Sequence, residues 1–191
     1  MKHRNHKLAK TSNIITQSNR EYAENNFQKY DAILGVNHQG PISTLVGSKP
    51  RLDQYGKPYL YLHRPVADAD TPIQVDIQAW VDFGISALNS GSLLVYCEIG
   101  QNRSVIVSSL IQSRFEKRSW WSVVEEYHEE LLKEDPSHDW WPYGHWEKSI
   151  TEWLVKDVAS PPKEIIVPPP SGPIPLEEAL RLSGGARPDY L

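Results

Sequence analysis

The only cysteine of this 191-residue chain, Cys97, stands at the start of a short polar loop that ends at Arg103 and Ser104. With Gly100 between them, these residues make the pattern Cys-x-x-Gly-x-x-Arg-Ser. A thiol reacts as its thiolate, which a nearby guanidinium and the N–H groups of a helix N-terminus stabilise. The same donors bind phosphate oxygens. The pattern therefore predicts a thiolate beside a phosphate site, whereas the alternative interpretation is a buried structural cysteine in a strand-to-helix turn.

Apolar segments flank this loop on both sides. Residues 92–97 form a short apolar run that fits a buried strand. Residues 103–118 are again apolar, with interspersed serines, and fit a buried helix. A strand, a tight loop and a helix N-terminus point backbone N–H groups at an anion, so the flanking elements support the phosphate-site interpretation.

Helical and β-prone segments alternate along the rest of the chain, which favours an α/β fold. Ser18 and Glu21 have the spacing of a capping box and predict a helix that begins after Ser18 and includes Tyr30. Hydrophobic periodicity and stop signals predict further helices over 75–88, 119–135 and 145–157. Strands are predicted over 13–16, 31–36, 43–46 and 59–62.

The composition restricts the class of protein. A net charge of −4 argues against a nucleic-acid binder held by bulk charge. One cysteine cannot form an internal disulfide and fits a reducing compartment. The N-terminus lacks the apolar run of a secretory signal, and no stretch reaches the length of a membrane span. We therefore expect a soluble, cytoplasmic protein without a membrane partner.

The chain is predicted to have three parts. Residues 1–11 are basic and polar and are expected to be a disordered tail. Residues 12–157 form the folded domain. Residues 158–191 form a flexible tail, because eight of the 15 prolines fall after residue 160. Within this tail, residues 176–182 have the composition for two helical turns, so the tail is either disordered or a linker ending in a docking peptide for a protein partner.

Other residue types give no sign of a metal or cofactor. His128, His138 and His145 show no metal-ligand spacing with the cysteine, so neither a metal site nor a cofactor is expected. The pair Trp140 and Trp141 is interpreted as a lid over the core rather than as a platform for a ligand.

The segment from Val95 to Ser104 resembles the signature His-Cys-x-x-Gly-x-x-Arg-Ser/Thr of the protein tyrosine phosphatase superfamily. The order of elements over about residues 12–157 is similar to that of its small dual-specificity phosphatases, and this region is too short for the larger tyrosine phosphatase domain. The resemblance implies a central, mostly parallel sheet of four to five strands flanked by helices. It also implies metal-free hydrolysis of phosphomonoesters through a phosphocysteine.

The resemblance assigns a role to each residue of the loop. Cys97 is the nucleophile, the planar guanidinium of Arg103 binds two phosphate oxygens, and Ser104 hydrogen-bonds the sulfur as it leaves. Backbone N–H groups stabilise the charge of the transition state. The phosphate-binding residues are Glu98, Ile99, Gly100, Gln101, Asn102 and Arg103.

The resemblance also places a general acid at the end of an upstream strand. Two carboxylates lie in the loop over 63–72, Asp68 and Asp70. Asp68 fits the placement in the family better, and Asp70 remains the alternative because its distance to the next helix is also suitable. Either residue could instead be a helix cap or a solvated carboxylate.

The sequence departs from the family at two places. Tyr96 replaces the histidine that normally precedes the cysteine, and this change could make the thiolate less favoured. Glu98 introduces a carboxylate into a loop without lysine, which disfavours highly charged substrates. The main hypothesis is a phosphatase for phosphotyrosine in proteins, extending to phosphoserine and phosphothreonine. The alternatives are a phosphatase-like binding module, or a phosphatase acting on RNA 5′ ends or small molecules.

Overall fold

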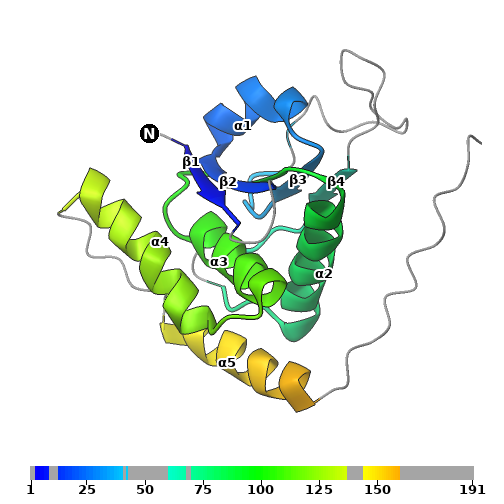
Figure 1. The fold of residues 1–191 in the computed structure, drawn as a ribbon, viewed down its shortest axis with the longest axis vertical. Coiled ribbons are helices and arrows are strands. Elements are labelled where there is room, and N and C mark those ends of the chain that lie inside the picture. Colours follow the sequence, from blue (N-terminus) through cyan, green and yellow to red (C-terminus); the bar gives the residue numbers. More distant parts are fainter. Residues whose placement is uncertain are drawn as a thin grey trace, which may run out of the picture. The chain divides into compact units, whose positions relative to one another are not determined.

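The computed structural model describes residues 3–8, 13–40, 42, 60–67, 70–136 and 144–159 of the chain. Residues 1–156 form one compact unit (Figure 1). Outside the described residues lie the predicted strand 43–46, Asp68, His138, the Trp140–Trp141 pair and the tail after residue 159, with its helix over 176–182. Within the described ranges, none of the helices combines the length and apolar character that crossing a membrane requires.

In the described part of the chain, five strands form one mixed sheet in the order β1-β2-β5-β3-β4. Their bounds are β1 Arg4–Lys7, β2 Ile14–Asn19, β3 Ala32–Gly35, β4 Leu60–His63 and β5 Leu93–Cys97. Strands β2, β5, β3 and β4 run parallel, and β1 is antiparallel to β2. The predicted α/β fold with a mostly parallel sheet of four to five strands is confirmed.

Strand β5 is the centre of this sheet, and all five of its residues are buried. An apolar run of this length is typical of a parallel strand that is covered on both faces. Leu93 pairs with Ile15 of β2 on one side and with Ala32 of β3 on the other. Since parallel strands end at the same edge, β5 delivers Cys97 to the edge where β2 and β3 also end.

Helices cover both faces of the sheet (Figure 1). On one face, α1 (Arg20–Asn26) and the 3-10 turn η1 (Phe27–Lys29) enclose a small core that includes Leu94 and Tyr96. A larger core fills the other face, where Val95 and Cys97 contribute from β5. The helices that supply it are α2 Gln74–Ser90, α3 Arg103–Glu116, α4 Trp120–Glu134 and α5 Gly144–Ala159.

The predicted helix cap at Ser18 is wrong by one residue. Asn19 is the N-cap of α1, and its side-chain oxygen accepts a hydrogen bond from the N–H of Tyr22 at 2.8 Å. Ser18 is still part of β2, where it pairs with Tyr96. Pairing with β5 therefore extends the strand past the position at which the local signal would start the helix.

The prediction that residues 1–11 are a disordered tail is wrong for Arg4–Lys7, which form strand β1. Burial alternates along this strand, but its buried positions are Arg4 and His6. A strand whose inward residues are polar has no hydrophobic alternation, and therefore gives no strand signal. Contacts with other elements compensate, because Arg4 donates to Gln17 and the His6 ring stacks on Tyr127 at 3.6 Å.

The buried ring of His6 predicts a loss of stability in acid. Burial, with a smaller contribution from the charge of Arg4, lowers the pKa of His6 to about 3, although Glu130 lies 3.4 Å away. The carboxylate of Glu130 is half exposed, so its attraction is screened and desolvation dominates. Because the unfolded chain binds this proton more readily below about pH 6.5, stability falls as the pH drops toward 3.

We expect the free energy of unfolding to decrease by about 2 kcal/mol more in the wild type than in His6→Phe between pH 7 and pH 5. The phenyl ring keeps the stacking on Tyr127 but does not titrate. Urea unfolding of both proteins at the two pH values measures the difference. Equal losses of stability would show that His6 is protonated in the folded protein.

Candidate active site

The loop after β5 turns back so that two groups hydrogen-bond the sulfur of Cys97. The hydroxyl of Ser104, in the first turn of α3, lies 3.2 Å from Sγ, and the N–H of Gly100 donates to Sγ at 3.2 Å. Cys97 and Ser104 are both buried. The structure thus brings together the predicted nucleophile, the predicted serine and the curled loop.

Gly100 is required by the path of this loop. Its φ of +78° lies in the left-handed region, where residues with a Cβ are strained. A Cβ on Gly100 would also lie 2.6 Å from the backbone nitrogen of Asn19. The loop is therefore pressed against the junction between β2 and α1, which leaves space for hydrogen alone.

Arg103 is the first residue of α3, and it is 2% exposed. Its Nη1 donates to the carbonyl oxygen of Val66 at 3.0 Å and lies 3.4 Å from Nδ1 of His38. Val66 belongs to the segment after β4, and His38 follows β3. The guanidinium thus connects the loop of Cys97 to the segments that follow two neighbouring parallel strands.

The segment after β4 is the predicted acid loop, and two of its described backbone carbonyls accept hydrogen bonds from tryptophans. Trp80 of α2 donates to the carbonyl of Arg64 at 3.1 Å, and Trp146 of α5 donates to the carbonyl of Asp70 at 2.7 Å. Asp70 is exposed, whereas Asp68 lies outside the described residues. The choice between the two carboxylates as general acid therefore stays a prediction.

Comparison with known proteins was made by sequence and by structure. No family model matches the chain, and no curated protein matches its sequence. Human DUSP28 superposes with a TM-score of 0.55 at 17% identity, over 76% of this chain and 95% of that one. DUSP15 gives a TM-score of 0.51 at 22% identity, over 73% and 81% of the two chains. The chain has the dual-specificity phosphatase fold.

A further solved structure extends the comparison to a complex with a lipid. PTPMT1 in complex with PI(5)P superposes with a TM-score of 0.55 at 12% identity, over 76% of this chain and 92% of that one. The resemblance inferred from the Cys97 loop is confirmed at the level of the fold. In this phosphatase fold, the contacts of Cys97, Ser104 and Arg103 lie at the edge where the parallel strands end.

The loop between Cys97 and Ser104 carries a carboxylate, that of Glu98, at its rim. Its neighbours are polar side chains on one side and an apolar side chain next in the loop. Nη1 of Arg20 lies 3.9 Å from the Glu98 carboxylate, and the Arg20 N–H donates to the Glu98 carbonyl at 3.3 Å. With its amide nitrogen facing Glu98, Gln39 donates to both carboxylate oxygens, at 3.1 and 3.2 Å. Ile99, next in the loop, is 58% exposed. The rim therefore carries an exposed apolar side chain next to a partly neutralised negative charge.

Tyr96, at the position of the family histidine, faces away from the sulfur. Its hydroxyl lies 3.0 Å from that of Tyr61, within the core on the α1 side, whereas Cys97 belongs to the opposite core. Burial raises the pKa of Tyr96, and the hydrogen bond with Tyr61 raises it further. A Cβ on Gly35 would lie 2.5 Å from this hydroxyl, so Gly35 makes room for the ring.

We expect Tyr96→Phe to lower the free energy of unfolding by about 1 kcal/mol, the typical value of a buried hydrogen bond, and to leave the rate of Cys97 alkylation unchanged. Urea unfolding and iodoacetamide labelling measure the two quantities. Tyr22→Phe is the matched control, because it removes a similar 3.0 Å contact, with Tyr30. A change in alkylation confined to Tyr96→Phe would contradict the separation of Tyr96 from the sulfur.

Three residues of the site were not predicted from the sequence. Gln17 of β2 donates to the Gly100 carbonyl and to the Ser104 hydroxyl, His38 lies beside the guanidinium, and Trp146 holds the acid loop. The only local signal was at Gln17, a polar residue that continues a β-prone run. Each of these contacts joins segments far apart in the sequence, so spacing along the chain could not reveal it.

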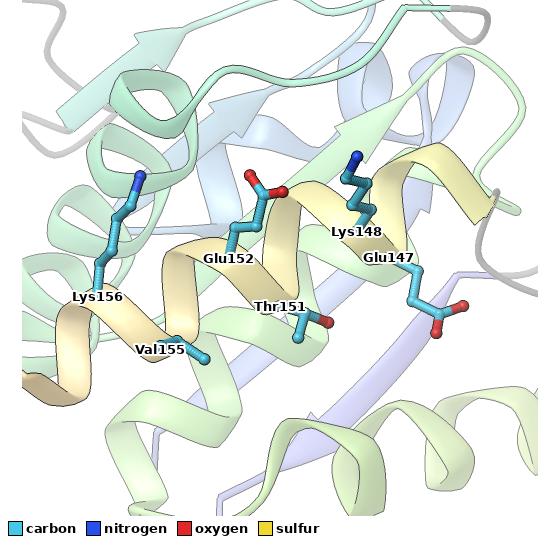
Figure 2. Close-up of a pocket in the computed structure, with 6 residues that line it drawn as sticks. All are labelled: Glu147, Lys148, Thr151, Glu152, Val155 and Lys156. Carbon is cyan, nitrogen blue, oxygen red and sulfur yellow. The ribbon is translucent and has the colours of Figure 1, made fainter.

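A separate surface pocket lies on α5 (Figure 2). Its described lining residues all belong to this helix: Glu147, Lys148, Thr151, Glu152, Val155 and Lys156. Trp146 and Trp153 of the same helix are buried, which places the pocket on the outward side of α5. None of residues 97–104 is among its described lining residues, so this pocket is separate from the Cys97 loop.

Proposed function

We propose that this protein is a cysteine-dependent phosphatase that hydrolyses phosphomonoesters through a phosphocysteine intermediate. The observation that carries the proposal is the hydrogen bonding of one buried thiol by Ser104 and Gly100, with the guanidinium of Arg103 at the other end of the same loop. The fold shared with the dual-specificity phosphatases supports it.

The reaction proceeds in two displacements at phosphorus. In the first, Sγ of Cys97 attacks, the P–O bond to the leaving group breaks, and a carboxylic acid, Asp68 or Asp70, protonates the departing oxygen. In the second, the resulting carboxylate takes a proton from water, whose oxygen attacks phosphorus as the S–P bond breaks. The Ser104 hydroxyl hydrogen-bonds the departing thiolate. Loop N–H groups and Arg103 stabilise the charge on the phosphoryl oxygens in both steps.

A phosphorylated protein is the substrate that we favour, with phosphotyrosine first and phosphoserine or phosphothreonine next. Exposed Ile99 offers an apolar contact for an aromatic leaving group. Glu98 and the absence of lysine from residues 98–102 disfavour polyphosphorylated ligands and RNA ends. The complex of PTPMT1 with PI(5)P makes an inositol lipid the second candidate, which is tested beside the first.

Wild-type protein is expected to release phosphate from p-nitrophenyl phosphate, and Cys97→Ser to lose at least about a thousandfold in kcat because an alcohol is a far poorer nucleophile. Ser108→Ala is the matched control, since Ser108 is also buried in α3 but does not belong to the loop. Its activity should remain close to that of the wild type.

Equal rates for wild type and Cys97→Ser would contradict the proposed function. A folded wild type without turnover that still binds a phosphotyrosine peptide would instead indicate a phosphatase-like binding module. The same assay with phosphotyrosine peptide, PI(5)P vesicles and triphosphate-ended RNA distinguishes the substrate classes. We expect the phosphopeptide to give the highest kcat/KM.

Replacing the two carboxylates identifies the general acid. Asp68→Asn is expected to lower kcat for a phosphotyrosine peptide by about a hundredfold, the usual size of a general-acid contribution, and to remove one limb of the pH–rate profile. Asp70→Asn should keep both limbs. The reverse outcome would assign the proton transfer to Asp70, and unchanged kinetics in both variants would contradict acid catalysis from this loop.

A further inference from the structure

A continuous chain of hydrogen bonds leads from the first strand to the sulfur of Cys97. Nη1 of Arg4 donates to Oε1 of Gln17 at 3.0 Å. Nε2 of Gln17 donates to the Ser104 hydroxyl oxygen at 2.8 Å and to the Gly100 carbonyl at 2.6 Å. The Ser104 hydroxyl in turn lies 3.2 Å from Sγ. All of these residues are buried.

We propose that Gln17 and Arg4 are positioning residues, which aim the Ser104 hydroxyl and the Gly100 N–H at the sulfur. The proposal rests on the proposed function, because it assigns these residues to the thiolate of that reaction. It also makes strand β1 part of the active site, although β1 lies at the edge of the sheet and has no direct contact with the loop among the hydrogen bonds described.

The chemistry of the neighbours fixes the orientation of the Gln17 amide. A guanidinium donates hydrogen bonds and accepts none, so the atom that faces Arg4 must be the amide oxygen. A carbonyl oxygen accepts and does not donate, so the atom that faces Gly100 must be the amide nitrogen. Arg4 and Gly100 therefore require the same orientation of Gln17, and rotation of the amide would break both contacts.

That orientation places an N–H donor against the oxygen of Ser104, so the hydroxyl hydrogen points away from Gln17. The Ser104 oxygen accepts one N–H of Gln17, and the hydroxyl has a single hydrogen to donate. A thiolate has no hydrogen to donate, so the hydroxyl is the donor across its 3.2 Å contact with an ionised Sγ. A hydrogen bond to a charged acceptor is stronger than one to a neutral acceptor, so this donor favours the thiolate over the neutral thiol.

The second N–H of Gln17 acts on the loop backbone. By holding the Gly100 carbonyl, it fixes the peptide that follows Gly100, and the glycine φ of +78° relates this peptide to the preceding one, which carries the Gly100 N–H. The N–H of the same residue then donates to Sγ at 3.2 Å. One buried amide thus positions both groups that hydrogen-bond the sulfur.

The register of the sheet explains why Arg4 can take part. Arg4 lies directly opposite Gln17 in the antiparallel pair of β1 and β2, and both side chains project from the face that carries α3. Neighbouring Asn5 projects from the other face, where it accepts a hydrogen bond from Thr16 at 2.8 Å. Substitution of Asn5 therefore weakens the pairing of β1 with β2 but leaves the hydrogen bonds from Arg4 to Cys97 in place.

The experiment measures alkylation of Cys97 by iodoacetamide from about pH 4 to about pH 9, together with p-nitrophenyl phosphate kinetics. Since Cys97 is the only cysteine, labelling reports on this residue alone. Gln17→Leu removes the amide, and Gln17→Glu keeps an acceptor for Arg4 but cannot donate from an ionised carboxylate. Asn5→Ala is the matched control. Arg103 and Glu98, the charged residues of the loop, are unchanged in every variant.

We expect both Gln17 variants to move the midpoint of the alkylation profile upward by about one pH unit, the equivalent of one charge-assisted hydrogen bond. Their kcat should fall about tenfold, while KM changes less than twofold. Arg4→Met should move the midpoint in the same direction, Arg4→Lys should restore it in part, and Asn5→Ala should leave it in place.

Unchanged midpoints in folded Gln17 and Arg4 variants would overturn the proposal and leave these residues with a structural role alone. A shift of equal size in Asn5→Ala would overturn it too, since any weakening of β1 would then suffice. If Gln17→Leu does not fold, the alkylation midpoints of Gln17→Glu, Arg4→Met and Arg4→Lys test the proposal instead. Failure of the proposed function is distinguishable, because a wild type inert toward p-nitrophenyl phosphate still has an alkylation midpoint to compare.

Discussion

The parallel pairing of β5 between β2 and β3 is the constraint on which the rest of the structure depends. It fixes one sheet edge at which three chain segments end together: the Cys97 loop, the corner at Asn19 and the turn at His38. The loop must pass so close to the Asn19 backbone that only glycine fits at position 100. From the same pairing follow the burial of the thiol, the start of α3 and the place of Arg103.

Polar groups within the larger core distinguish this site from an ordinary strand-to-helix turn. Arg103 donates to a backbone carbonyl, and Gln17 uses both of its amide hydrogens and its oxygen. Buried polar groups are costly unless they are hydrogen-bonded, and a well-satisfied network holds its members in one geometry. The network therefore holds the Ser104 hydroxyl and the Gly100 N–H beside the sulfur, as the proposed stabilisation of a thiolate requires.

Several elements followed from local sequence. The apolar run of β5, the periodicity of α2 and the serine-rich apolar segment of α3 each predicted the element that the structure contains. Strand β1 did not follow, because its buried residues, Arg4 and His6, are polar and are stabilised by partners in β2 and α4. The helix start was displaced for a related reason, since pairing with β5 keeps Ser18 in the strand. In both cases tertiary contacts outweighed the local pattern.

The sequence by itself determined the predicted reactive group, the thiol of Cys97. A cysteine, a glycine, an arginine and a serine within eight consecutive residues already specify a loop that can hold a thiolate and an anion, because these groups need only local backbone to meet. The tertiary structure alone decided what surrounds that thiol. Gln17 meets Ser104 across 87 residues and Trp146 meets Asp70 across 76. Such contacts depend on the register of strands and the packing of helices, which are settled only when the whole core is buried.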